Sequence, residues 1–267
     1  MIAVRSEMEL ELLRRAASIL REVMESVGRL VAPGISTSEI DRFVEDLIVR
    51  QGGRPAFKGY RGFPAASCIS IDDVVVHGIP GPRRLREGQI VSIDIGVEKE
   101  GYFSDMARTF PVGEVPQEKI RLMRRTEEAL WLGISQARDG RRVGDISHAI
   151  QSYVEAAGYS VVRDLVGHGI GRQMHEEPQI PNFGSPGTGP RLRSGMVLAI
   201  EPMVNAGKPW VRTRRDGWTV ITKDGLPSAH FEHTVVVTDG PPEVLTASPQ
   251  LVRRISDFLR SRGINWG

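Results

Sequence analysis

Apolar and polar residues alternate most clearly between positions 90 and 110. The apolar residues fall on every second position, a period that predicts a β-strand: Val91, Ile93, Ile95 and Val97. A charged turn and a second alternating run follow. We expect a hairpin that folds about the Lys99–Glu100 bond, which places Asp94 opposite Asp105 on one face.

Two facing carboxylates in an apolar hairpin need a counter-charge. Opposed residues on paired strands have Cβ atoms only ~5 Å apart, and like charges there are destabilising. A proton shared between Asp94 and Asp105 would supply the charge, and so would a divalent metal ion. The alternative is a solvated sheet edge with two surface acids.

Helical spacing of apolar residues predicts four helices, at 6–30, from about 37 to 52, at 117–138 and at 143–157. Ser6 and Glu9 resemble a capping box at the start of the first helix. Between the first helix pair and the hairpin lie an aromatic-rich loop, 54–67, and a strand or short hairpin that ends at His77.

The second helix pair copies the first, which indicates an internal duplication. Five residues recur at an offset of 106: Gly34, Ile40, Val44, Ile48 and Gly52 match Gly140, Ile146, Ile150, Val154 and Gly158. Asp94 matches Glu201 at an offset of 107, and a second returning strand delivers Glu232. Four converging carboxylates cannot all stay ionised in a partly buried site, so a metal site is favoured over a shared proton.

Two histidines, His168 and His175, lie in the glycine-rich run LVGHGIGRQMHEEP. One imidazole and four carboxylates can hold two divalent ions if two carboxylates bridge them. A ligand set of mostly oxygen atoms with one nitrogen atom is compatible with Mn, Fe, Co or Zn ions. His148 and His233 lack this setting and are interpreted as structural.

Composition limits the remaining function classes. The chain has 267 residues and a net charge of +2, too balanced to indicate a nucleic acid as substrate. Cys68 is the single cysteine, which excludes an internal disulfide and fits a reducing cytosol. We expect no signal peptide, because the first residues lack an apolar h-region, and no run approaches the ~20 apolar residues of a membrane span.

Five motifs, taken in order, resemble the type I methionine aminopeptidases: HGIP, SIDIGVEKEGYFSDMARTF, GHGIGRQMHEEP, LAIEPM and FEHTVVVT. The resemblance covers nearly the whole chain. It implies an α+β pita-bread fold, in which a curved antiparallel sheet is covered by helices. A single catalytic domain, 1–267, would comprise two pseudo-symmetric halves, roughly 1–113 and 114–267.

The resemblance also implies an activity, the cotranslational removal of initiator methionine when the second residue is small. It implies two metal ions and five ligands: Asp94, Asp105, His168, Glu201 and Glu232. Asp105 and Glu232 would bridge the ions. Glu201 would also take the proton from the attacking water, His175 would polarise the scissile carbonyl and His77 would contact the scissile amide.

The methionine pocket of the family maps onto five residues of this chain: Tyr60, Phe63, Cys68, Met174 and Trp218. The resemblance implies that His77 and His175 also bind the substrate. Three positions depart from the most familiar bacterial pattern, where Cys, Phe and Gln are common: Phe57, Met174 and His230. These departures leave the shape of the pocket open, whereas the ligand set is complete.

Two other functions are weighed against this one. A related metallopeptidase acting on X-Pro bonds would usually carry an extra N-terminal domain, and a non-catalytic binding module on the same fold would have lost ligands. The resemblance implies a cytoplasmic monomer that acts on the N-terminal methionine of nascent polypeptides. Association with the ribosome is a candidate interaction for which the sequence offers no patch.

Overall fold

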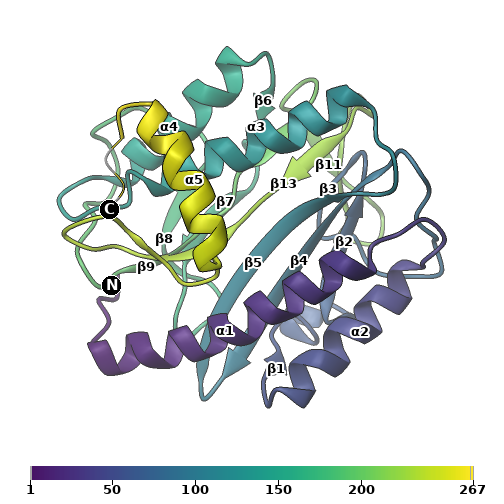
Figure 1. The fold of residues 1–267 in the computed structure, drawn as a ribbon, viewed down its shortest axis with the longest axis horizontal. Coiled ribbons are helices and arrows are strands. Elements are labelled where there is room, and N and C mark those ends of the chain that lie inside the picture. Colours follow the sequence, from purple (N-terminus) through teal and green to yellow (C-terminus); the bar gives the residue numbers. More distant parts are fainter. Residues whose placement is uncertain (1, 265, 267) are drawn as a thin grey trace.

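The computed structural model describes residues 2–264 and 266. Helices cover one side of a layer of antiparallel strands (Figure 1). Among these residues the α-helices are α1 (Glu7–Leu30), α2 (Thr37–Arg50), α3 (Gln117–Ile134), α4 (Val143–Ala156) and α5 (Pro249–Ser261). The four predicted helices are confirmed, and α5 is an addition to them.

The strands form four antiparallel sheets. The first contains β1 (Arg54–Pro55), β2 (Ser67–Ile71), β4 (Ile90–Lys99) and β5 (Tyr102–Pro111). The second contains β7 (Val166–Gly169), β8 (Glu176–Pro181), β9 (Val197–Ile200), β14 (His233–Val236) and β15 (Glu243–Val244). Two three-stranded sheets complete the layer, one of β3 (Val74–Val76), β11 (Val211–Thr213) and β12 (Val220–Thr222), the other of β6 (Ser160–Val161), β10 (Met203–Asn205) and β13 (Ser228–His230).

Each helix pair packs its apolar stripe against one of the two larger sheets. The start of α1 has the predicted capping box, in which Ser6 and Glu9 satisfy each other's backbone N–H groups. Its buried face, with Leu20 and Val27, joins α2 and the β4–β5 hairpin in one core cluster. The α3–α4 pair surrounds the fully buried Trp131 in a second cluster with β9.

The hairpin turn differs from our prediction by one residue. Its central residues are Glu100 and Gly101, both with positive φ (53° and 81°), as a two-residue turn with a right-handed strand twist requires. Asp94 therefore pairs with Ala107, and Asp105 pairs with Gly96. The predicted pairing of Asp94 with Asp105 is wrong. The two acids are instead diagonal neighbours, and because the shift is two positions they still share one face.

Two threonine hydroxyls join β5 to the chain around β13 and β14. The Thr109 hydroxyl accepts the N–H of His230 at 2.9 Å and donates to its carbonyl oxygen at 2.8 Å. The Thr234 hydroxyl does the same for Asp105, at 2.9 Å and 2.8 Å. We call these two threonines and their backbone partners the hydroxyl seam. It satisfies buried backbone groups at the place where the two larger sheets meet.

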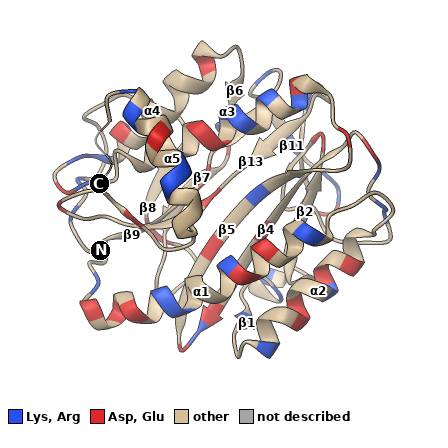
Figure 2. Cartoon of the chain, in the orientation of Figure 1, with Lys and Arg blue, Asp and Glu red and all other residues tan. Residues whose placement is uncertain are grey.

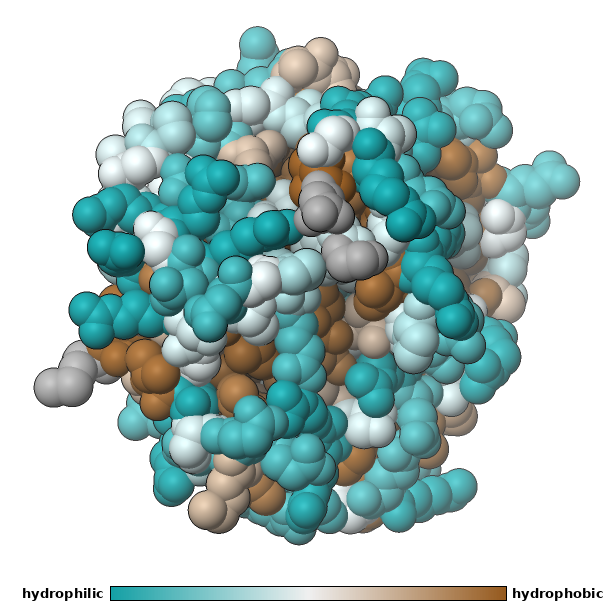
Figure 3. Space-filling model, turned by 60° about the vertical axis from the view of Figure 1, so that its left-hand side comes forward, coloured by the Kyte–Doolittle hydropathy of each residue, from teal (hydrophilic) through white to brown (hydrophobic). Residues whose placement is uncertain are grey.

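The surface is largely hydrophilic on the face drawn in Figure 3, with apolar residues in small patches. Few large apolar side chains are exposed among the described residues, and the most exposed of them is Met8 at 77%. In the part of the chain described here, no helix is long and apolar enough to cross a membrane. His148 is exposed on α4, whereas His233 is buried and packs against Trp131, and neither lines the cavity described below.

We expect Thr109→Val and Thr234→Val each to lower the free energy of unfolding by about 1–3 kcal/mol. Valine keeps the shape of threonine but leaves a buried N–H and a buried carbonyl without their partner. Chemical denaturation of the two variants measures the loss. Thr213→Val, at an exposed strand position, is the control and should change stability little; losses no larger than in this control would contradict the role of the seam.

Candidate active site

A cavity of about 150 Å³ opens where the two larger sheets meet. Thirteen residues line it: Phe57, Tyr60, Arg61, Phe63, Cys68, His77, Asp94, Asp105, His168, His175, Glu201, Trp218 and Glu232. The structure therefore brings together all the site residues expected from the sequence except Met174. Phe57, noted above only as a departure, and Arg61 are additional lining residues. Both belong to the aromatic-rich loop 54–67.

Strand pairing explains how five residues from distant parts of the chain meet. Asp94 lies on β4 and Asp105 on β5, on the same face of the hairpin. His168 on β7 pairs with Ala199 on β9, two residues before Glu201, so their side chains point the same way. Glu232 lies between β13 and β14, and its N–H donates to Ala107 on β5 at 2.9 Å. That bond extends the hydroxyl seam and holds Glu232 beside Asp105.

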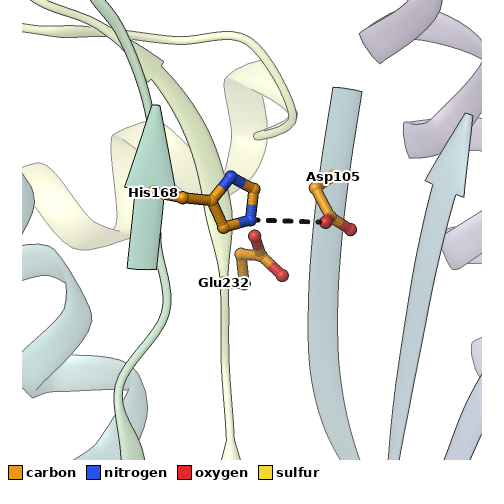
Figure 4. A group of neighbouring side chains, drawn as sticks. All are labelled: Asp105, His168 and Glu232. Atoms are coloured by element: carbon orange, nitrogen blue, oxygen red, sulfur yellow. Dashed lines mark ion pairs between the residues drawn. The ribbon is translucent and has the colours of Figure 1, made fainter. Parts of the chain in front are cut away.

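Three of these side chains form the densest group of metal-ligand atoms. One ligand atom each from Asp105, His168 and Glu232 lies within 4.8 Å of the others, and all three residues are buried (Figure 4). His168 Nε2 lies 3.9 Å from Asp105 Oδ2 and 3.6 Å from Glu201 Oε1. These distances are longer than a hydrogen bond. They are compatible with ligand atoms that share a cation between them.

The tautomer of His168 follows from one hydrogen bond. Its Nδ1 lies 2.9 Å from the carbonyl oxygen of Gly169, which can only accept, so Nδ1 carries the proton. The lone pair of Nε2 then faces the carboxylates, as in many metal-binding histidines. Burial lowers the pKa of His168 to about 4, so the ring is neutral and able to act as a ligand at neutral pH.

The carboxylates lack the partners that buried charges need. Asp94 Oδ1 and Glu232 Oε1 are buried and have no hydrogen-bond partner among the described residues. Burial raises the pKa of Asp94 to about 7 and that of Glu201 to about 8. Burial and the neighbouring acids raise the pKa of Asp105 and Glu232 well above the usual range. Unpartnered carboxylate oxygens around a neutral imidazole fit divalent cations of intermediate hardness.

Charged side chains outside the cavity are distributed differently from the carboxylates that line it. Figure 2 shows most acidic and basic residues on helices and loops, whereas an acidic band lies within β5. The neighbouring Asp94 carboxyl is one cause of the raised pKa of Asp105. The carboxylates of the cavity therefore need a counter-charge, for which the sequence favours a metal ion over a shared proton.

His175 lies at the open side of the cavity. Its Nδ1 is 2.9 Å from the Tyr60 hydroxyl, and the two rings stack at 5.2 Å. Its ring centre is 4.3 Å from that of His168. His77 follows β3 and packs edge-on against Trp218 at 6.4 Å. Burial lowers the pKa of His77 to about 4 and of His175 to about 3, so both rings are neutral hydrogen-bonding groups.

The opposite wall of the cavity is apolar. Phe63 and Trp218 meet edge to face at 5.2 Å, and Cys68 is a buried free thiol whose pKa burial raises well above its usual value. Met174 is only 1% exposed and does not line the cavity. It packs behind the wall, in the same apolar cluster as Phe57. A role for Met174 in substrate binding therefore requires that it act through its neighbours.

The third departure, His230, is also placed away from the apolar wall. It is 1% exposed, and its Nε2 lies 3.7 Å from Glu201 Oε2 with no hydrogen-bond partner among the described residues. His230 thus faces the carboxylate cluster rather than the pocket, on the same side as Glu232, as residues two apart in an extended chain do.

Comparison with known proteins supports the interpretation of the cavity as an active site. The family model for metallopeptidase family M24 matches residues 11–239. A methionine aminopeptidase from Clostridium perfringens is 53% identical over 92% of this chain and 99% of that protein. Methionine aminopeptidase 1 from Bacillus subtilis is 49% identical with the same coverage. The crystal structure of methionine aminopeptidase from Thermotoga maritima superposes with a TM-score of 0.91, at 42% identity over 93% of this chain and 100% of that chain.

We expect the metal-free protein to lose thermal stability as the pH rises from about 6.5 to about 8, above the range in which the buried histidines, with pKa values lowered to about 3 to 4, contribute the opposite trend. The folded pKa values of Asp94 and Glu201, about 7 and about 8, lie above the ~4 of unfolded carboxyls, so the folded state binds more protons in this window. Divalent metal should restore more stability at the upper end, because protons compete with it at low pH. Scanning calorimetry with and without chelator tests this; a metal-free Tm that is constant or rising across the window would contradict it.

Proposed function

The chain belongs to metallopeptidase family M24, and we propose that it removes the initiator methionine from new polypeptides by hydrolysis at a pair of divalent metal ions. Its identity to methionine aminopeptidases over most of its length makes it a metal-dependent aminopeptidase of the same kind, with the expected pita-bread fold. The observation that carries the proposal is the convergence of four carboxylates, of which Asp105 and Glu232 are buried and Asp94 and Glu201 half-buried, and a neutral imidazole in one cavity.

The proposed ligands are the five residues implied by the resemblance, with Asp105 and Glu232 bridging the two ions. Support comes from the grouping of Asp105, His168 and Glu232 and from the unpartnered oxygens of Asp94 and Glu232. Four carboxylates and one imidazole supply enough donors for two ions only if two carboxylates are shared. The mixed oxygen and nitrogen set is compatible with Co, Mn, Fe or Zn.

When bound, divalent ions supply Lewis acidity, which polarises a carbonyl and lowers the pKa of water. The chain's own residues would supply the proton transfers and the orientation. Glu201 is the proposed general base, because its carboxylate lies beside His168 in the ligand cluster, where it could accept a proton from the attacking water. His175 would donate through Nε2 to the scissile carbonyl, its Nδ1 accepting from the Tyr60 hydroxyl. His77 would contact the scissile amide.

The apolar wall is the proposed binding site for the methionine side chain. Tyr60, Phe63 and Trp218 are rigid and can contact a thioether favourably, and Cys68 completes the wall. Met174 would support this wall from behind. Because the cavity of about 150 Å³ must also hold that side chain, we propose that it accepts only a small second residue next to His77.

A further proposal concerns the cellular setting of the protein. The buried free thiol of Cys68 suits a reducing cytoplasm. We propose that the protein acts there as a monomer, cotranslationally, in association with the ribosome. We also propose that residues 1–267 form one catalytic domain with related halves, 1–113 and 114–267, of which residues 1, 265 and 267 lie outside the described structure.

We expect Met-Ala-Ser to be cleaved by the protein as purified, not after chelation, and again after metal is added back. Met-Leu-Ser should be cleaved much more slowly, because its second residue is large. Ala-Pro peptides test the alternative of an X-Pro peptidase, and measured metal content tests that of a binding module. Preference for Ala-Pro over Met-Ala-Ser, or turnover that persists without metal, would overturn the proposal.

Asp105→Asn should bind metal more weakly and lose nearly all peptidase activity, since a bridging carboxylate would lose its charge. Metal titration by calorimetry and peptide turnover, measured on the same preparation, check this. Normal turnover by metal-replete Asp105→Asn protein would be incompatible with a dinuclear mechanism.

For His175→Ala we expect full metal content but a kcat lower by about 10²-fold or more, as for other donors to a developing oxyanion. Metal analysis together with steady-state kinetics separates this role from that of a ligand. If metal is lost while the loaded fraction turns over normally, His175 is a ligand instead.

A further inference from the structure

We infer that Arg5, in the segment before α1, is a positioning residue that holds the loop carrying His175 in its productive place. The inference rests on the role proposed for His175 above. It assigns a function to a residue that is distant in the sequence from the proposed metal ligands.

An ion pair links the two segments. Arg5 Nη2 donates to Glu176 Oε2, and the two side chains are only 7% and 16% exposed. Glu176 directly follows His175 in the sequence. Its second oxygen, Oε1, accepts the N–H of Gln173 at 3.0 Å. The carboxylate therefore spans the turn from 173 to 176 and fixes the backbone on both sides of His175.

The guanidinium also lies against the backbone of the same loop. A Cβ atom at Gly171 would lie 2.1 Å from Arg5 Nη2, so only glycine allows this approach. The N–H of Gly171 donates to the carbonyl of Gln173 at 3.2 Å, and its own carbonyl accepts the N–H of Phe103, on the catalytic strand β5, at 2.8 Å. Arg5 thus fills the space inside a turn that is tied to β5.

The backbone of Arg5 is itself held, so its side chain can act as a fixed support. Its N–H donates to the carbonyl of Gly195 at 2.8 Å, two residues before β9, and Ser6 begins the capping box of α1. The other end of the guanidinium, Nη1, lies 3.7 Å from Glu9 in the acidic first turns of α1 (Figure 2). A planar fork can contact both acids at once, which a lysine ammonium cannot.

The contacts of the His175 ring itself fix only part of its orientation. Its hydrogen bond and its stacking partner are both Tyr60, in the aromatic-rich loop 54–67. Tyr60 can keep the ring upright, whereas the backbone beside it is held by the pairing of Glu176 with Gly169, by the bond from Phe103 to Gly171 and by the Arg5–Glu176 pair. Displacement of a catalytic group by about 1 Å can lower turnover by about 10²-fold.

The test is a double-mutant cycle on metal-loaded protein with Met-Ala-Ser as substrate. We expect Arg5→Ala to lower kcat by about 10- to 100-fold, with metal content and KM nearly unchanged, and Arg5→Lys to lose less. In the His175→Ala background, Arg5→Ala should lower kcat by less than about 2-fold, because both residues act through the same group.

Arg14→Ala is the matched control. Arg14 lies on α1 and forms a two-pronged pair with Glu243 on β15, at 2.7 Å and 2.8 Å, away from the His175 loop. The Arg14→Ala substitution should lower Tm while leaving kcat near the wild-type value. If Arg5→Ala does not fold, Glu176→Gln breaks the ion pair with less change of shape and takes its place in the cycle.

Each failure has a different meaning. A wild-type kcat for folded Arg5→Ala or Glu176→Gln, or an undiminished loss in the His175→Ala background, would overturn the positioning role alone. A wild-type kcat for His175→Ala would overturn the proposed function of His175, and with it the premise of this inference.

Discussion

The hydroxyl seam is the contact on which the site depends. Asp105 and Glu232 come from different halves of the chain, and no backbone ladder between β5 and β14 runs through this junction. Thr109 and Thr234 satisfy the backbone groups that would otherwise be unpaired there. Together with the backbone bond from Glu232 to Ala107, they let the fold hold two acidic side chains side by side without a continuous ladder. The proposed cation between them would offset a repulsion that the backbone arrangement imposes.

Much of the site could be predicted because β-structure has a strict period. Alternation alone placed Asp94 and Asp105 on one face, and this survived the wrong register because the shift was an even number of residues. The duplication then pointed to Glu201 and Glu232. The register itself depended on which residues adopt positive φ, and the charged turn offered Glu100 and Gly101 as well as Lys99. The four longest helices followed from apolar spacing and capping for the same reason of periodicity.

Other features could not be predicted, because they depend on contacts between distant segments. Nothing near Met174 in the sequence indicates that it packs behind the cavity wall while its neighbour His175 faces the opening. The approach of His230 to Glu201 depends on the seam, since Thr109 holds the backbone of His230. Arg5 is one of many arginines in the chain, and only the fold shows that it is buried.

The seam also has a consequence for the order of folding. Its hydrogen bonds join residues 121 and 129 positions apart. Contacts at such separation form late, because the chain entropy of closing a long loop opposes them until both ends are structured. The first helix pair and the β4–β5 hairpin are local and can form as soon as they are synthesised. The proposed metal centre could not form until Glu232 has been made, so a growing chain would stay catalytically silent for most of its own synthesis.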